Sequence, residues 1–472
     1  MSGRHDDYVT ELGYTRGYFS ELSLPHVRLA LLKHGFAPPD IRTCCEMGFG
    51  QGLSLAIHAA AAPAVWYGTD INAEHMAAAT ELVRSSGATA HLHQEPFADL
   101  AERTDVPPFD FVGMNGVWSW VSEQTRGTIV DFLRRKLKPG GVLFVSYISS
   151  GWRPFQPLQE LLAAHAHQHA HSQAPLTERM EASLAFAERL RQAAPGYLED
   201  NPRADEYLDD LAAKDRRFLA HDLFNRHYHP MSLAAVRTQL AQAGLVHAGS
   251  ADLGDLDAIR LTPKQRQLLD TIEESALRES VRDFLVNRFA RRDYFIKGPA
   301  KTLSPEERLE ALRRMRFIAL RPHPELPAKL RAVLTLQRTG LTEELQRPIF
   351  EALASLSPLS LERAENLAKS NGRGGAEALD VLLLGAATGQ LSPIQDATDI
   401  DPRRPFTRAL NARLVEKPFD EDDTEYLASP VTGAGVAVRR RLLPLLSSHR
   451  DGGPGPDSHS GQIAVLRALG IA

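Results

Sequence analysis

Cysteine is almost missing from this 472-residue chain, which has only Cys44 and Cys45, side by side. Neighbouring residues of a strand point to opposite faces of a sheet, so we expect no disulfide between them. The chain also lacks an apolar run of about 18 residues, the length that crosses a membrane, and its N-terminus lacks an apolar stretch of signal-peptide length. We therefore expect a protein without a membrane span that works in the reducing cytoplasm.

The sequence also has no large excess of charge. Its 54 Lys and Arg residues stand against 59 Asp and Glu residues, a net charge of -5. The basic cluster Arg439–Arg441 is explained by a solvated helix end, and residues 420–423 form an acidic stretch. The acidic stretch and the near balance of charges argue against a nucleic-acid partner.

The sequence offers no convincing metal site. His165, His167, His169 and His171 alternate along a predicted helix, where they form i,i+4 pairs on two different faces. No carboxylate or cysteine completes a ligand set, so a solvated helix face is expected and no metal is predicted.

What the chain does have is a glycine-rich stretch, "CCEMGFGQGLS", at residues 44–54. Gly48, Gly50 and Gly52 occupy every second position after Glu46. Each glycine would cost about 1 kcal/mol in a helix interior, so the stretch predicts a tight turn that something approaches closely.

The flanking sequence alternates between strand and helix patterns. A buried strand precedes the glycines and a small-residue helix follows them, and this alternation predicts a parallel sheet with right-handed crossovers. Ligands bind such sheets at the carboxyl ends of the strands, near the switch in strand order. We predict strands at 41–48, 64–71, 89–94, 109–115 and 141–148, helices at 23–35, 53–62, 72–87 and 125–141, and a closing helix at 231–244 with strands at 245–253 and 291–298.

Two acidic residues suggest the ligand. Asp70 ends the second strand, where a carboxylate can hold both hydroxyls of a ribose. Glu46 would repel a pyrophosphate and suits a cationic ligand, and the spacing differs from the G-x-G-x-x-G dinucleotide pattern. These residues favour S-adenosylmethionine, and a glycine turn in another nucleotide-binding fold is the alternative.

Several motifs carry a resemblance to a known family. "EMGFGQG", "GTDI", "HQEPFAD", "FDFVGMNGVWSWVS" and "KLKPGGVLFVSY" resemble class I S-adenosylmethionine-dependent methyltransferases. "YFSELS", "SYISSGW" and "AHDLFNRHYHPM" narrow the resemblance to bacterial members with a methyltransferase regulatory domain, a group that includes the rickettsial protein-lysine methyltransferases. The resemblance covers about residues 8 to 300. It implies a Rossmann-like seven-stranded sheet with helical insertions, the product S-adenosylhomocysteine and a homodimer.

The resemblance also implies roles for particular residues. Those next to the methionine and ribose of the cofactor would be Glu46, Gly48, Gly50 and Gly52, with Asp70 on the ribose hydroxyls. Those next to the adenine would be Ile71, Gln94 and Phe97, with Asn115 and Gly116 beside the methyl group, while Tyr14 and Tyr18 would close over the cofactor or simply pack the N-terminal arm.

Methyl transfer to an amine needs a neutral, aligned nitrogen. We expect the oxygen of Asn115 to accept a hydrogen bond from that nitrogen and Trp118 to pack on the methyl group. Tyr147 is the third predicted catalytic residue, and it would form an aromatic channel with Trp118, Trp120 and Trp152. The alternative for Trp118 and Trp120 is a place in the core.

The pattern divides the chain into four parts. We predict a cofactor-binding core at 1–152, a helical regulatory insertion at 153–228, the completion of the methyltransferase fold at 229–300, and a mainly helical C-terminal domain at 301–472 with a pattern like that of a winged helix. The insertions and the extra domain favour a large substrate or a dimer contact.

The leading hypothesis is therefore methylation of a protein amine, in particular lysine. One alternative is methylation of a glycan or a small molecule, with His227 or His229 as the base for a hydroxyl. The other is a non-catalytic protein that binds S-adenosylmethionine as a regulator.

Overall fold

The computed structural model describes residues 8–168, 174–193, 195–254, 261–322, 343–370, 375–416, 424–444 and 460–471. The acidic stretch at 420–423, His169 and His171 lie outside these residues. Among the described helices, none is long and apolar enough to cross a membrane. No group of three or more potential metal ligands occurs in the described ranges.

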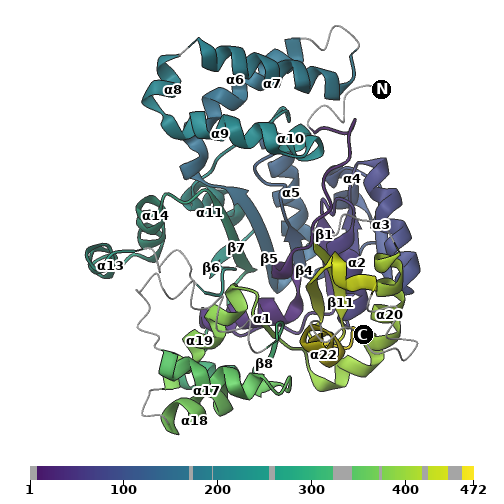
Figure 1. Cartoon of the computed structure of the whole chain (residues 1–472), viewed down its shortest axis with the longest axis vertical. Coiled ribbons are helices and arrows are strands. Elements are labelled where there is room, and N and C mark those ends of the chain that lie inside the picture. Colours follow the sequence, from purple (N-terminus) through teal and green to yellow (C-terminus); the bar gives the residue numbers. More distant parts are fainter. Residues whose placement is uncertain are drawn as a thin grey trace.

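A seven-stranded sheet forms the centre of the molecule (Figure 1). Its strand order is β3-β2-β1-β4-β5-β7-β6, and only the pairs made by β7 are antiparallel. This confirms the predicted Rossmann-like methyltransferase sheet. The strands are β1 (Thr43–Met47), β2 (Val65–Thr69), β3 (Ala90–His93), β4 (Phe109–Met114), β5 (Leu137–Ile148), β6 (Leu245–Ser250) and β7 (Ala290–Lys297).

The parallel strands meet in a register that brings their carboxyl ends together. Glu46 of β1 pairs with Gly68 of β2 on one side and with Gly113 of β4 on the other. The residues that follow these three strands therefore gather at one edge, where the strand order switches between β1 and β4.

Helices cover the sheet as the sequence pattern predicts, with one correction. The helix predicted at 125–141 is observed as α5 (Glu123–Lys136), and the segment Lys138–Gly141 belongs to β5, because Pro139 and two glycines disfavour a continued helix. The other helices of this part are α1 (Leu24–Lys33), α2 (Leu53–Ala61), α3 (Ala73–Ser86), α4 (Phe97–Glu102), α11 (Leu233–Ala241), α13 (Pro263–Asp270) and α14 (Ser275–Val286), with short 3-10 helices at Ser20–Leu22 and Ser150–Phe155.

A helical insertion lies beyond the carboxyl edge of the sheet (Figure 1). It has an apolar core of its own that includes Leu162, Met180 and Phe224. The insertion therefore folds as a packed layer rather than as a loose loop. Its helices are α6 (Gln156–Gln168), α7 (Leu176–Gln192), α8 (Gly196–Asp200), α9 (Pro202–Ala213) and α10 (Arg216–Asp222).

The C-terminal region packs on the side of α2 and α3 that faces away from the sheet. Gln395 donates to the carbonyl of Ala61 at 2.9 Å, and Arg413 forms an ion pair with Glu81 of α3. Every residue of α2 is buried, because the sheet covers one side of this helix and the C-terminal region the other. The apolar core of the sheet thus continues into the C-terminal region.

From α17 to β10 the order of elements is helix, strand, helix, helix, strand, which is the order found in a winged helix. A small three-stranded sheet in this region has the order β10-β8-β9. Its central strand, β8, precedes α17 in the chain. The elements of this region are α15 (Pro305–Arg313), β8 (Arg316–Ala319), α17 (Glu343–Leu353), β9 (Leu359–Ser360), α18 (Leu361–Ser370), α19 (Gly375–Ala387), β10 (Leu391–Pro393), α20 (Ala397–Val415), β11 (Thr424–Ser429), β12 (Ala434–Arg439) and α22 (Ser460–Ala468).

Candidate functional site

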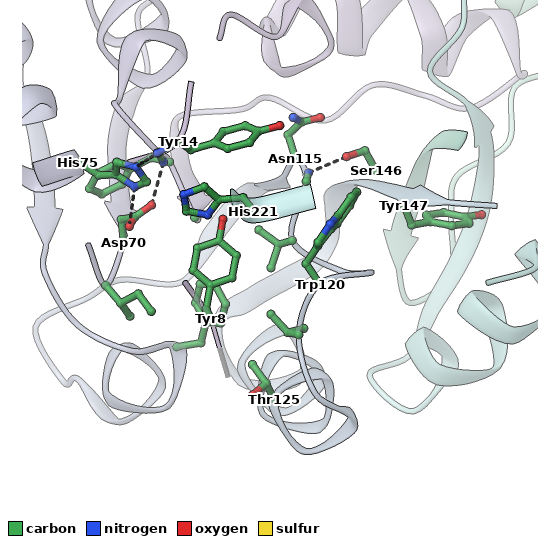
Figure 2. Close-up of a pocket in the computed structure, with 18 of the residues that line it drawn as sticks. Tyr8, Tyr14, Asp70, His75, Asn115, Trp120, Thr125, Ser146, Tyr147 and His221 are labelled. Atoms are coloured by element: carbon green, nitrogen blue, oxygen red, sulfur yellow. Dashed lines mark hydrogen bonds and ion pairs between the residues drawn. The ribbon is translucent and has the colours of Figure 1, made fainter. Parts of the chain in front are cut away.

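A cavity of about 790 Å³ opens at the carboxyl ends of β1, β2, β4 and β5 (Figure 2). It is lined by the N-terminal segment, the glycine turn, the loops after β2, β3 and β4, and α10 of the insertion. Of the predicted site residues, it brings together Tyr14, Gly48, Gly50, Asp70, Ile71, Phe97, Asn115, Gly116 and Tyr147.

The three predicted glycines all have left-handed backbones, with φ of +73° at Gly48, +56° at Gly50 and +71° at Gly52. A Cβ on Gly50 would meet no atom within 4 Å, so this position is open. A Cβ on Gly52 would lie 2.3 Å from the Cβ of Ala79 in α3. Gly48 and Gly50 therefore face the cavity, whereas Gly52 lets α2 and α3 approach each other and does not line it.

Asp70 holds the glycine turn to the end of β2. Its Oδ2 accepts from the backbone N–H of Gly50 at 2.9 Å. Its Oδ1 accepts from the N–H of Asn72 at 2.9 Å and from Nδ1 of His75 at 3.1 Å (Figure 2). Three donors on a buried carboxylate fix its orientation and stabilise its charge.

The state of His75 follows from its second partner. The backbone N–H of Tyr14 donates to Nε2 of His75 at 2.7 Å, so this nitrogen carries no proton. His75 is therefore neutral and donates its Nδ1–H to Asp70. Gln51 of the glycine turn also donates to the carbonyl of Tyr14 at 2.5 Å, so the N-terminal segment is tied to both sides of the Asp70 network.

Glu46 lies beneath the glycine turn and is 1% exposed. Its Oε2 has no hydrogen-bond partner among the described residues. Burial, with a smaller effect from the charge of Asp70, raises the pKa of Glu46 to about 8. Glu46 is thus a buried acid without a cationic partner, and it does not itself line the cavity.

Asn115 and Gly116 follow β4 at the middle of the cavity. The N–H of Gly116 donates to Oγ of Ser146 at 2.8 Å, which fixes the turn (Figure 2). The half-buried Asn115 amide has no hydrogen bond to another described residue. Its oxygen is therefore available to a ligand, as predicted for the reacting nitrogen.

Three other predicted residues lie away from the cavity. Trp118 and Tyr18 take the packing alternative, and the placement of Gln94 was wrong. Trp118 is fully buried in the core beneath the loop, and Trp120 lines the cavity instead. The hydroxyl of Tyr18 accepts from the N–H of Gly435 at 2.7 Å, so it joins the N-terminal segment to β12. Gln94 is exposed and does not line the cavity.

The hydroxyl of Tyr147 is engaged in a buried polar cluster that the sequence analysis missed. It donates to Asp293 at 2.7 Å, and Figure 2 shows it pointing away from Asn115. Arg291 donates to both oxygens of Asp293 and also reaches Asp283 of α14 at 2.6 Å. Burial alone would raise the pKa of Asp293, but Arg291 holds it well below its usual range. Tyr147 therefore lines the cavity with its ring, while its hydroxyl joins β5 to β7.

The insertion contributes two further lining residues, His221 and Asp222 of α10. The hydroxyl of Tyr14 lies 3.5 Å from Oδ1 of Asp222, and the rings of Tyr8 and Tyr14 each lie 5.1 Å from that of His221. Burial raises the pKa of Asp222 to about 7, although the hydrogen bond from Tyr14 opposes this. The cavity is thus completed by a helix of the insertion between β5 and β6.

The suspected bases His227 and His229 do not line this cavity, and neither does Trp152. His227 and His229 stack on each other at 5.8 Å, and the N–H of His229 donates to the carbonyl of Ser119. Trp152 packs on Phe155 and Tyr207 in the core of the insertion. The structure therefore gives no support to a histidine base at these positions.

Comparisons with known proteins match two families. The model of a methyltransferase domain matches residues 16–247, and that of a predicted methyltransferase regulatory domain matches residues 215–297. An uncharacterized protein of Synechocystis is 32% identical over 459 residues, which cover 95% of this chain and 89% of that protein.

The chain belongs to the class I S-adenosylmethionine-dependent methyltransferases with a regulatory domain.

More distant proteins are also similar to this chain, in fold or in sequence. The structure of PKMT2 from Rickettsia typhi in complex with AdoHcy is 18% identical, has a TM-score of 0.65, and is matched over 92% of this chain and 88% of that chain. An uncharacterized protein of Rickettsia prowazekii is 22% identical over 271 residues, 56% of this chain and 48% of that protein.

The cavity of this methyltransferase fits its cofactor. The turn is open at Gly50, the Asp70 carboxylate faces the same space, and the buried Glu46 beneath the turn lacks a cationic partner. A sulfonium and an ammonium group supply positive charge of the kind that this arrangement stabilises.

The pKa of Glu46 predicts a pH-dependent stability of the ligand-free methyltransferase. The folded pKa of about 8 lies above the unfolded value of 4.5, so the protonated acid favours the folded state below pH 4.5 and this contribution is lost as pH rises through 8. Relative to Glu46→Gln, the wild type should lose about 1–3 kcal/mol between pH 5.5 and 8. Thermal unfolding of both proteins across this range tests it, and a gap in Tm that stays constant with pH would contradict it.

Proposed function

We propose that this methyltransferase transfers its methyl group to an amine of a protein, in particular the side chain of lysine. The observation that carries the proposal is Asp222, a half-buried acid with a pKa of about 7 that lines the cavity together with aromatic rings. Tyr8, Tyr14 and Trp120 line the same space. A carboxylate and aromatic faces attract a cationic amine and suit it better than they suit an anionic acceptor.

We assign the cofactor to the residues around the glycine turn. Asp70 would hold the ribose, Gly48 and Gly50 would let the amino-acid end approach the backbone, and Glu46 would lie near its positive charge. Ile71 and Phe97 would enclose the adenine, and Asn115 and Gly116 would lie beside the methyl group. When bound, S-adenosylmethionine supplies an activated methyl group with a neutral leaving group.

The chemistry left to the protein is to present a neutral amine. Lysine is charged at pH 7, and its nitrogen lone pair becomes available only after a proton leaves. Asp222 is suited to accept that proton, since its pKa lies near neutral pH. The amide oxygen of Asn115 would then orient the nitrogen by accepting one of its remaining N–H groups.

A protein substrate is supported by two features. The motifs quoted above resemble the rickettsial protein-lysine methyltransferases. The cavity is also bordered by α10 of the helical insertion, which a small metabolite would not require. We also propose a cytoplasmic location, with which two free, buried cysteines agree.

Transfer of labelled methyl groups tests the function. The methyltransferase is incubated with [methyl-³H]S-adenosylmethionine and cell fractions, and protein is separated from small molecules. We expect base-stable label in protein that co-elutes with methyl-lysine after acid hydrolysis. Label confined to small products would favour the glycan or small-molecule alternative, and no label despite cofactor binding would favour a regulator.

In the same assay, Asp222→Asn should lower the initial rate of protein labelling by about 10²–10³-fold at pH 7.5, because the proton acceptor is lost. The wild-type rate should rise as pH passes through about 7, and the variant should lose this rise. Asp210→Asn on the exposed side of α9 is the matched control and should label normally. If Asp222→Asn has the rate and pH profile of the wild type, Asp222 is not the proton acceptor.

We further propose that two copies associate through apolar residues of α13 and α14. Phe284 is 85% exposed, Leu277 54% and Leu268 49%, and α14 contains no fully buried residue. Figure 1 shows both helices at the outer edge of the molecule, beside β6. Large apolar side chains gathered on one surface are typical of a protein–protein contact.

Replacement Phe284→Glu should therefore convert a dimer to a monomer, because a charge would be buried without a partner. Light scattering coupled to gel filtration measures the mass directly. Leu161→Glu on α6, where the side chain is 43% exposed, is the control and should leave the dimer intact. A wild type that is monomeric at micromolar concentration would refute the proposal.

A further inference from the structure

The hydrogen bonds of Asp70 leave it short of acceptor capacity for a ribose. A carboxylate offers about four acceptor positions, two on each oxygen. Asn72 and His75 occupy both positions of Oδ1, and Gly50 occupies one of Oδ2. Asp70 therefore has room for about one more donor, whereas a ribose presents two neighbouring hydroxyls.

A second hydrogen-bond acceptor, His221, lines the cavity from α10 of the helical insertion. Nε2 of His221 lies 2.7 Å from the carbonyl oxygen of Leu12. Because a carbonyl can only accept, Nε2 carries the proton and Nδ1 of the neutral ring carries a free lone pair. Burial also lowers the pKa of His221 to about 4, which agrees with a neutral ring.

The free nitrogen is placed for a ligand. His221 is 2% exposed, its Nδ1 has no partner among the described residues, and the ring lines the cavity. The ring centroid lies 6.3 Å from that of His75, the residue that donates to Asp70, and Figure 2 shows His221 beside this pair. A buried acceptor without a donor is costly, and a ligand hydroxyl would remove the cost.

We propose that Nδ1 of His221 accepts a hydrogen bond from one of the two ribose hydroxyls, while Asp70 accepts from the other. The inference rests on the proposed cofactor site and adds to it a binding residue supplied by the regulatory insertion.

The N-terminal segment explains how a residue of the insertion is held there. Leu12 accepts from His221, and Tyr14, two residues later, bonds to His75 and Gln51. The short segment from Leu12 to Tyr14 thus connects α10 to α3 and to the glycine turn through hydrogen bonds of its two end residues. The ribose would complete this connection from inside the cavity.

Calorimetric titration with three ligands separates a direct contact from a merely structural role. The ligands are S-adenosylhomocysteine and its 2′-deoxy and 3′-deoxy analogues, and the proteins are the wild type, His221→Phe and His221→Asn. Phe keeps the ring contacts with Tyr8 and Tyr14 but removes both nitrogens. Asn can donate to Leu12 with its amide nitrogen and accept with its oxygen.

For the wild type, removal of the hydroxyl that faces His221 should weaken binding about tenfold. His221→Phe should weaken the binding of S-adenosylhomocysteine by a similar factor. This variant should bind that deoxy analogue and S-adenosylhomocysteine equally well, so the ratio of the two Kd values falls to about one. The ratio of the Kd values of the other deoxy analogue and S-adenosylhomocysteine should be the same in the wild type and His221→Phe. His221→Asn should restore the preference for S-adenosylhomocysteine over the first analogue.

If His221 only anchored Leu12, the Phe variant would weaken all three ligands by one common factor, and unchanged ratios would overturn the inference while leaving the cofactor site in place. A wild type that binds no S-adenosylhomocysteine would overturn the cofactor site and this inference together. Thermal unfolding of each variant checks that the fold is retained.

Discussion

The carboxylate of Asp70 is the interaction on which the site depends. It accepts from the glycine turn and from Asn72 and His75 at the start of α3, so one side chain sets the relative positions of the end of β2, the glycine turn and α3. Through His75 it also positions the backbone of Tyr14. The positive φ of Gly48 and Gly50 lets the turn bring the N–H of Gly50 to this carboxylate, and a side chain at either position would be strained.

The regulatory insertion takes part in the cavity instead of standing apart from it. His221 and Asp222 are adjacent on α10, and they reach the cavity beside two tyrosines of the N-terminal segment. The sheet supplies Asp70 and the glycine turn, and the insertion supplies the half-buried acid Asp222, with a pKa near 7, and Nδ1 of His221, which has no partner among the described residues. On this account the insertion contributes to binding of both the cofactor and the acceptor, because both groups line the cavity.

The sequence allowed the sheet, Asp70, Gly48, Gly50 and Asn115 to be placed, because each follows a strand with clear periodicity and parallel strands end at one edge. It did not distinguish Trp118 from Trp120, since both lie in an irregular loop where side-chain direction has no fixed period. Gln94 was misplaced for a similar reason. The contact of Asp222 with Tyr14 could not be predicted, because the two residues are 208 positions apart and local patterns carry no information on such contacts.

Titration of S-adenosylhomocysteine into the wild type and Asp70→Asn tests the central claim most directly. The wild type should bind one equivalent, and the variant should bind about 10–100-fold more weakly, because an amide nitrogen then faces a donor and the charge is lost. The variant should still show a cooperative thermal transition. Equal affinities in the two proteins, or no binding to the wild type, would contradict the account.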